Sequence, residues 1–154
     1  TFGRPVVRAL RESRWANQLW ECSHIGGDRF AANLVVLPDS LYFGNVSPES
    51  AAALLAEHDA GRLDLSCFRG RSTLRLAEQC AEHHVRQQLG VSDLTGVTAV
   101  TTLPDGQVQL DLQDGRTARV NVRRSDRPSP TRLTCKGKEG LAYPEFDVLD
   151  MDVA

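Results

Sequence analysis

The chain has 154 residues, of which 41% are hydrophobic and 25% charged, the composition of one soluble globular domain or of a domain with a small appendage. Its 18 basic and 20 acidic residues are spread along the sequence and give a net charge of −2, so no basic face indicates a nucleic acid or an anionic membrane as a partner. No apolar run approaches the roughly 20 residues that span a bilayer, and the first residues lack the layout of a signal peptide, so we expect a cytoplasmic protein without membrane contacts.

The first 90 residues carry four clear secondary-structure signals. Apolar residues at helical spacing predict a helix over residues 2–13. Two apolar runs on either side of a Pro-Asp-Ser turn predict a hairpin with strands at 34–37 and 41–46. An alanine- and leucine-rich stretch predicts an amphipathic helix over 48–60, and a second apolar stripe predicts a helix over 73–89.

The ends of these last two helices are marked by residues that suit helix termini. Ser47 is a typical N-cap, and Pro48 is a typical first helical residue. Ser72 is the expected N-cap of the later helix, and Gly90 is its expected stop. Residues 62–71, between the two helices, are expected to form a linker.

A short segment before the hairpin gathers groups that can carry chemistry. Residues 17–24 alternate in a way that predicts a strand, which places Cys22 and His24 on the same face. Gly26 and Gly27 then allow the chain to bend sharply. Thiolate and imidazole are both good ligands for soft or borderline metals, although a buried cysteine beside a hydrogen-bonded histidine is the commoner arrangement.

Most enzyme signatures are missing from the sequence, including a nucleophile elbow, a P-loop, a dinucleotide-binding glycine motif and an HExxH zinc motif. The four cysteines are far apart and form no C-x-x-C pair, which favours a reducing compartment. We expect Cys67 and Cys80 to be small buried residues, and Cys135 to lie where a strand end opens into a glycine-containing loop. The chain opens on Thr1 and its only methionine is Met151, so we expect it to be a C-terminal piece of a longer protein.

The character of the sequence changes from about residue 95. Apolar and polar residues alternate, interrupted by the turns Pro-Asp-Gly and Asp-Gly, which predicts an antiparallel meander of three strands. A last short strand is expected around 131–135, and residues 145–154 either add one more strand or fray. The order of the elements favours an α/β or α+β structure with helices against a mixed sheet.

The run WECSHIGGDRFAANLVVLPDSLYFGNVSPESAAALL, residues 20–55, resembles the central motif of the sucrase/ferredoxin-like family. Its specific core is S-H-x-G-G-(H/D)-R-F-A at residues 23–31, and the similarity extends over about residues 1–90. The domain of this family resembles the thioredoxin-like [2Fe–2S] ferredoxins. The resemblance therefore implies an α/β fold with a thioredoxin-like mixed sheet and flanking helices, in which residues 1–92 form the C-terminal part of the ferredoxin domain and residues 93–154 a β-rich extension.

The same resemblance implies electron transfer through a [2Fe–2S] cluster, with Cys22 and His24 as metal ligands. The residues that it places around the cofactor are Gly26, Gly27, Asp28 and Arg29. Some members of the family carry two histidines four apart, at the positions of His24 and Asp28, but a carboxylate is an uncommon iron–sulfur ligand, so Cys22 with His24 is the expected pair. The other ligands of the family come from an upstream cysteine loop that this sequence does not contain, so the chain alone is expected to hold a cluster poorly or not at all.

This function implies redox proteins as partners. A domain without its first strand exposes a sheet edge, so we also expect a homo-oligomer or association with an upstream segment. Two alternatives remain open. One is a thiol redox protein of the same fold with Cys22 as nucleophile, which lacks a nearby resolving cysteine. The other is a cluster-free binding or structural module.

Overall fold

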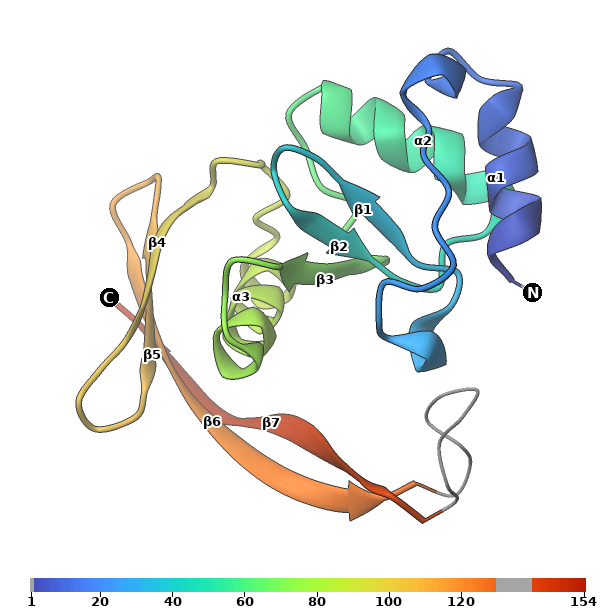
Figure 1. Ribbon diagram of the computed structural model, residues 1–154. Helices are drawn as coiled ribbons and strands as arrows, with labels where there is room; N and C mark the ends of the chain where they lie inside the picture. Colours follow the sequence, from blue (N-terminus) through green and yellow to red (C-terminus); the bar gives the residue numbers. More distant parts are fainter. Residues whose placement is uncertain (1, 130–139) are drawn as a thin grey trace.

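The computed structural model describes residues 2–129 and 140–154, apart from the side chain of Asp28, and combines helices with two antiparallel sheets (Figure 1). The first sheet contains, in spatial order, β1 (Leu34–Val36), β2 (Leu41–Phe43) and β3 (Phe68–Arg71). The second contains β4 (Val97–Thr102), β5 (Val108–Leu112), β6 (Thr117–Pro128) and β7 (Ala142–Val153). The α/β class and the C-terminal antiparallel meander are therefore confirmed. Within the described ranges, no helix is long and apolar enough to cross a membrane.

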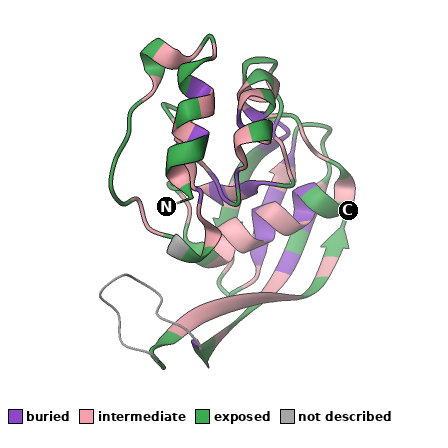
Figure 2. Cartoon of the chain, turned by 90° about the vertical axis from the view of Figure 1, so that its right-hand side faces the viewer, coloured by how far each residue is buried: buried purple, intermediate pink, exposed green. Residues whose placement is uncertain are grey.

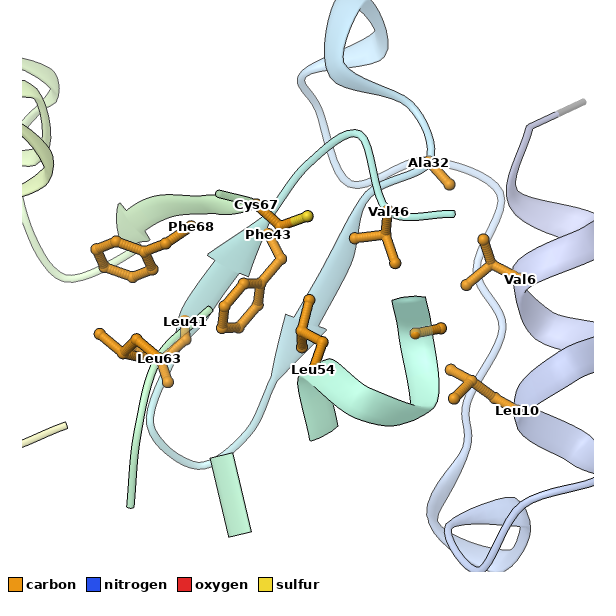
Figure 3. Packing of buried hydrophobic residues seen from close by; sticks show 11 residues of the cluster. Val6, Leu10, Ala32, Leu41, Phe43, Val46, Leu54, Leu63, Cys67 and Phe68 are labelled. Atoms are coloured by element: carbon orange, nitrogen blue, oxygen red, sulfur yellow. The ribbon is translucent and has the colours of Figure 1, made fainter. Parts of the chain in front are cut away.

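Two helices pack beside the first sheet, α1 (Gly3–Arg11) and α2 (Pro48–Asp59). Their buried apolar side chains meet those of β2 and β3 in one core (Figure 3), whose largest fully buried members are Leu10, Leu41, Phe43, Leu54 and Phe68. The predicted capping of α2 is confirmed, because the Ser47 hydroxyl accepts a hydrogen bond from the backbone N–H of Ser50 at 3.1 Å. The helix at 2–13 and the hairpin at 34–46 are confirmed with slightly shorter bounds.

The third helix, α3 (Leu76–Leu89), covers one face of the second sheet and also contacts β3 of the first. Ala81 and Val85 on α3 join the inward-facing residues of β5 and β6 in a second core. The helix ends at Gly90, whose φ of 66° is left-handed, as predicted. The prediction of Ser72 as its N-cap is wrong. The N-cap is Arg75, whose backbone N–H donates a hydrogen bond to the Glu78 carboxylate.

Two further expectations are wrong. Residues 17–24 form no strand: the short 3-10 helix η1 (Ala16–Gln18) is followed by irregular chain. These residues pair with no strand, and Trp20 is 91% exposed while its neighbour Leu19 packs against the first core. The linker at 62–71 contains β3, whose signal is weak because Phe68 is its only large apolar residue.

The last two strands form a long arm. β7 pairs with β6 from one end to the other, whereas β5 pairs only with the first four residues of β6, so the outer part is a two-stranded ribbon that curves below the first sheet (Figure 1). The ladder passes from Asn121 opposite Asp150 to Val122 opposite Val148, which leaves Leu149 without a partner. The tail is thus a strand, and the strand expected at 131–135 lies outside the described residues. Figure 2 shows the buried residues gathered where helices and sheets meet, and few on this ribbon.

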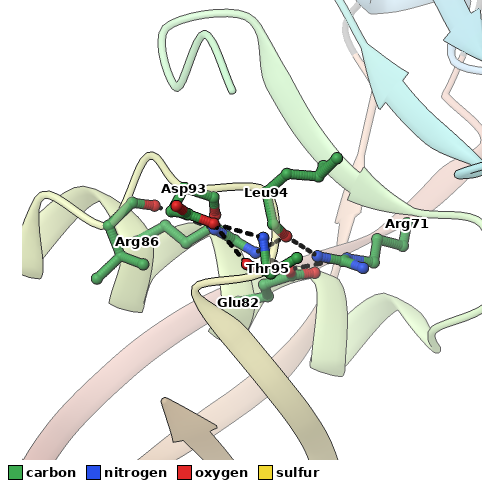
Figure 4. A network of polar contacts seen from close by, with 7 residues as sticks. Arg71, Glu82, Arg86, Asp93, Leu94 and Thr95 are labelled. Atoms are coloured by element: carbon green, nitrogen blue, oxygen red, sulfur yellow. Dashed lines mark hydrogen bonds and ion pairs between the residues drawn. The ribbon is translucent and has the colours of Figure 1, made fainter. Parts of the chain in front are cut away.

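A buried polar network connects the two sheets (Figure 4). The Glu82 carboxylate on α3 accepts hydrogen bonds from Arg86 at 3.0 Å and from Arg71 of β3 at 3.1 Å. Arg86 also donates to the carbonyl of Asp93, and Arg71 to that of Leu94, in the connection leading to β4. Glu82 and Arg86 are fully buried, and burial lowers the pKa of Arg86 while the Glu82 charge opposes that effect.

Candidate functional site

Cys22 and His24 lie on an exposed irregular segment between η1 and a second 3-10 helix, η2 (Asp28–Phe30). Both residues are exposed, and Cys22 is a free thiol. The expectation that one strand face holds both side chains is wrong, because there is no strand here. The structure nevertheless leaves a thiol and an imidazole two residues apart at the surface, outside both cores.

The end of this segment is held by a tight turn. Gly26 and Gly27 have φ angles of 83° and 68°, which confirms the bend that the two glycines predict. The side-chain amide of Asn33 donates to the carbonyls of Gly26 at 3.0 Å and Gly27 at 2.9 Å, and the N–H of Phe30 donates to Gly27 at 2.8 Å. The turn is therefore fixed by three hydrogen bonds.

The beginning of the segment is tied to the helices. Glu21 forms an exposed ion pair with Arg11 at the end of α1, at 3.3 Å. Just upstream, the Trp15 indole N–H and the Arg14 guanidinium both donate to Asp59 at the end of α2, at 3.0 and 2.8 Å. The stretch carrying Cys22 is thus held at one end by the ion pair of Glu21 and at the other by the turn at Gly26 and Gly27.

Cys22 and His24 are fewer ligands than a [2Fe–2S] cluster needs. Among the described residues, no group of three or more histidine, cysteine, aspartate or glutamate side chains could hold a metal ion. Cys67 is buried in the first core, and Cys80 is half-buried, with its thiol 3.5 Å from the Phe146 carbonyl. Burial raises the pKa of Cys80, and the nearby Asp147 charge adds to this. Such a cluster takes four protein ligands, of which Cys22 and His24 would supply two.

Two predicted residues, Cys135 and the side chain of Asp28, lie outside the part of the chain that the structure describes. A shallow hollow of about 500 Å³ between the starts of α1 and α2 is lined mainly by apolar residues, among them Phe2 and Val46. Neither Cys22 nor His24 lines this hollow, so it does not belong to the same site.

Arg29 belongs to a group of residues that the sequence does not bring together. Its guanidinium lies 4.6 Å from the ring centroid of Phe30 and 4.7 Å from that of Tyr143 on β7. The guanidinium of Arg69 on β3 lies 4.7 Å from the same Phe30 ring. Gly44 makes this packing possible, since a Cβ there would lie 2.8 Å from the Cβ of Phe30 and 3.2 Å from Nε of Arg69.

Comparison with protein-family models, with curated proteins and with solved structures gives no match to this chain. The resemblance to the sucrase/ferredoxin-like family therefore rests on the residue pattern itself, and the assignment of a function rests on that pattern and on the geometry described above.

Proposed function

We propose that this chain serves in one-electron transfer through a [2Fe–2S] cluster, to which it contributes Cys22 and His24. One observation carries the proposal: both donors are exposed together, outside either core, on a segment that is anchored at its two ends. Metal ligands held on a fixed loop need little reorganisation to bind. The pattern around them is the one that resembles the sucrase/ferredoxin-like family.

Each residue of the loop has a role in this proposal. Cys22 would hold the cluster as the thiolate and His24 as the neutral imidazole. When bound, the cluster supplies the one-electron chemistry, and mixed cysteine and histidine ligation favours a higher potential than four cysteines. Gly26 and Gly27 leave the backbone uncovered beside the donors, and Arg29 contributes positive charge.

The two missing ligands come from a second polypeptide segment, either a second copy of this chain or a segment upstream of it. Two copies that each contribute one cysteine and one histidine would complete a set of four. Redox proteins are the partners that such a carrier implies. We place it in the cytoplasm, because the three described cysteines are free thiols.

A cluster-free binding module is the alternative, and a specific observation favours it. Trp20, next to the donor segment, is 91% exposed, and large exposed aromatic residues are typical anchors of protein interfaces. A thiol redox function has less support, because the other described cysteines are buried in the first core or half-buried with a raised pKa.

The proposal is tested by anaerobic reconstitution with ferrous iron and sulfide, followed by iron and labile-sulfide assays, a visible spectrum and native mass spectrometry. We expect about one iron per chain in a dimer, or about two per chain in a version extended upstream of residue 1. Cys22→Ser and His24→Gln should abolish the colour, whereas the matched variants Cys80→Ser and His84→Gln should keep it.

Two results would contradict the proposal. One is the absence of iron from both the chain and its extended version, and the other is colour that survives both substitutions in the donor segment. In the first case, loss of partner binding on Trp20→Ala would become the measurement to pursue.

A further inference from the structure

Two guanidinium groups gather at the junction of η2, β3 and the β6–β7 arm. Arg29 and Arg69 share the ring of Phe30, and Arg29 also lies against Tyr143 near the outer end of β7. Because both groups are within 4.7 Å of one ring centroid, they stand less than about 10 Å apart. Residues from three distant parts of the sequence therefore bring two cations to one aromatic ring.

The ion pairs between described side chains include neither Arg29 nor Arg69. Within the described residues, no carboxylate lies at ion-pair distance from either guanidinium, although most other arginines of the arm have such a partner. Nε of Arg69 is buried and makes no hydrogen bond there. The Arg69 charge also acts on a histidine of α3. Burial lowers the pKa of His83, and the charges of Arg69 and His84 lower it further.

The aromatic contacts orient these groups for recognition. A guanidinium that stacks on a ring keeps its N–H edge free, and that edge matches two oxygens of one oxyanion. Stacking also reduces the side-chain freedom that binding would otherwise remove. Arg29 is exposed and Arg69 is partly so, which leaves both accessible to a ligand.

We propose that Arg29 and Arg69 form a binding site for a phosphate-class oxyanion, with Phe30 and Tyr143 holding the guanidinium groups in place. Two positive charges match a phosphate group, which carries about −1.5 to −2 at pH 7, better than they match a single carboxylate. The site does not depend on iron, so it stands or falls separately from the function proposed above.

The site is tested on the folded chain by isothermal titration calorimetry with inorganic phosphate and pyrophosphate at constant ionic strength, with succinate as the dicarboxylate comparison. We expect saturable binding of the phosphates and about tenfold weaker binding in Arg29→Gln and in Arg69→Gln. Tyr143→Leu, which keeps both charges, should weaken binding to a smaller extent. Arg119→Gln is the matched control, since Arg119 is exposed on β6 and away from the cluster.

Three results would overturn the proposal: no saturable phosphate binding by the unmodified chain, equal weakening in Arg119→Gln, or succinate binding as tightly as phosphate. Arg69 is packed over Gly44, so circular dichroism must show that its variant is folded. Should that variant fail to fold, Arg29→Gln and Tyr143→Leu still decide the question, because Arg29 is exposed and Tyr143 lies on the ribbon.

Discussion

At the scale of single residues, the close approach of Phe30 to Gly44 is the most sensitive contact near the arginine pair. Phe30 reaches over the end of β2, and its backbone carbonyl accepts a hydrogen bond from the N–H of Asn45 at 2.6 Å. Nothing larger than a hydrogen atom fits at position 44 without displacing Phe30 or Arg69. This glycine therefore controls how η2 sits on the first sheet.

Gly44→Ala should lower the free energy of unfolding by about 1–3 kcal/mol, the usual cost of forcing an extra group into a packed site. Urea denaturation followed by circular dichroism measures this. Gly3→Ala is the control, because a Cβ at Gly3 meets nothing within 4 Å and alanine suits a helix. Equal stability of the two variants would show that Phe30 is not held as described.

The residues of the candidate site were only partly predictable from the sequence. Cys22, His24 and the two glycines stand in one short run, and the run itself draws attention to Arg29. Phe30, Arg69 and Tyr143 were missed because ordinary arginine and aromatic residues carry no signal until the chain folds. A useful hint was available in α3, where Glu82 and Arg86 stand four apart on the side that also carries Val85.

At the scale of elements, local chemistry decides which helix ends could be predicted. Ser47 directly precedes proline and forms a capping box with Ser50, all within four residues. The start of α3 gives a contrasting case, because Ser72, which looks like a cap, stands three residues before the actual N-cap, Arg75. Similarly, the alternation at 17–24 was misleading, since a strand also needs a partner that the segment does not find.

Ser47→Ala should therefore destabilise the protein by about 1 kcal/mol, because it leaves an N–H at the start of α2 without its acceptor. Ser72→Ala, at the wrongly predicted cap, should change stability much less. Thermal unfolding of both variants, followed at 222 nm, makes the comparison. A larger loss in Ser72→Ala than in Ser47→Ala would contradict the assigned helix starts.

At the scale of the whole molecule, α3 joins the two sheets. Its apolar residues complete the second core, while Arg86 reaches to within 5.8 Å of the Phe68 ring in the first. Through Glu82, the same helix holds Arg71 of β3. We infer that the two sheets unfold together, because separating Arg71 of β3 from Glu82 breaks the network that holds the buried Glu82 and Arg86 charges.

Glu82→Gln should lower the free energy of unfolding by about 3 kcal/mol, because it leaves Arg86 buried without its counter-charge. Glu57→Gln, which removes an exposed ion pair with Arg62, is the matched control and should have a much smaller effect. Both variants should keep a single transition by circular dichroism and by tryptophan fluorescence. Two separated transitions in the unmodified chain would show that the sheets are independent.

The unpaired residue Leu149 determines which side chains of β7 face the second core. By adding one residue to β7, it lets Val148 and Met151, three apart, both pack against the second core. Neighbouring side chains on a strand point to opposite faces, so gaining or losing one residue between Val148 and Tyr143 turns the ring of Tyr143 away from Arg29. A change of two residues keeps the face and moves the ring along the ribbon by about 7 Å. Insertions or deletions of an odd number of residues in this arm thus reverse the face on which the Tyr143 ring lies. Those of an even number keep the face and change how far along the ribbon the ring lies.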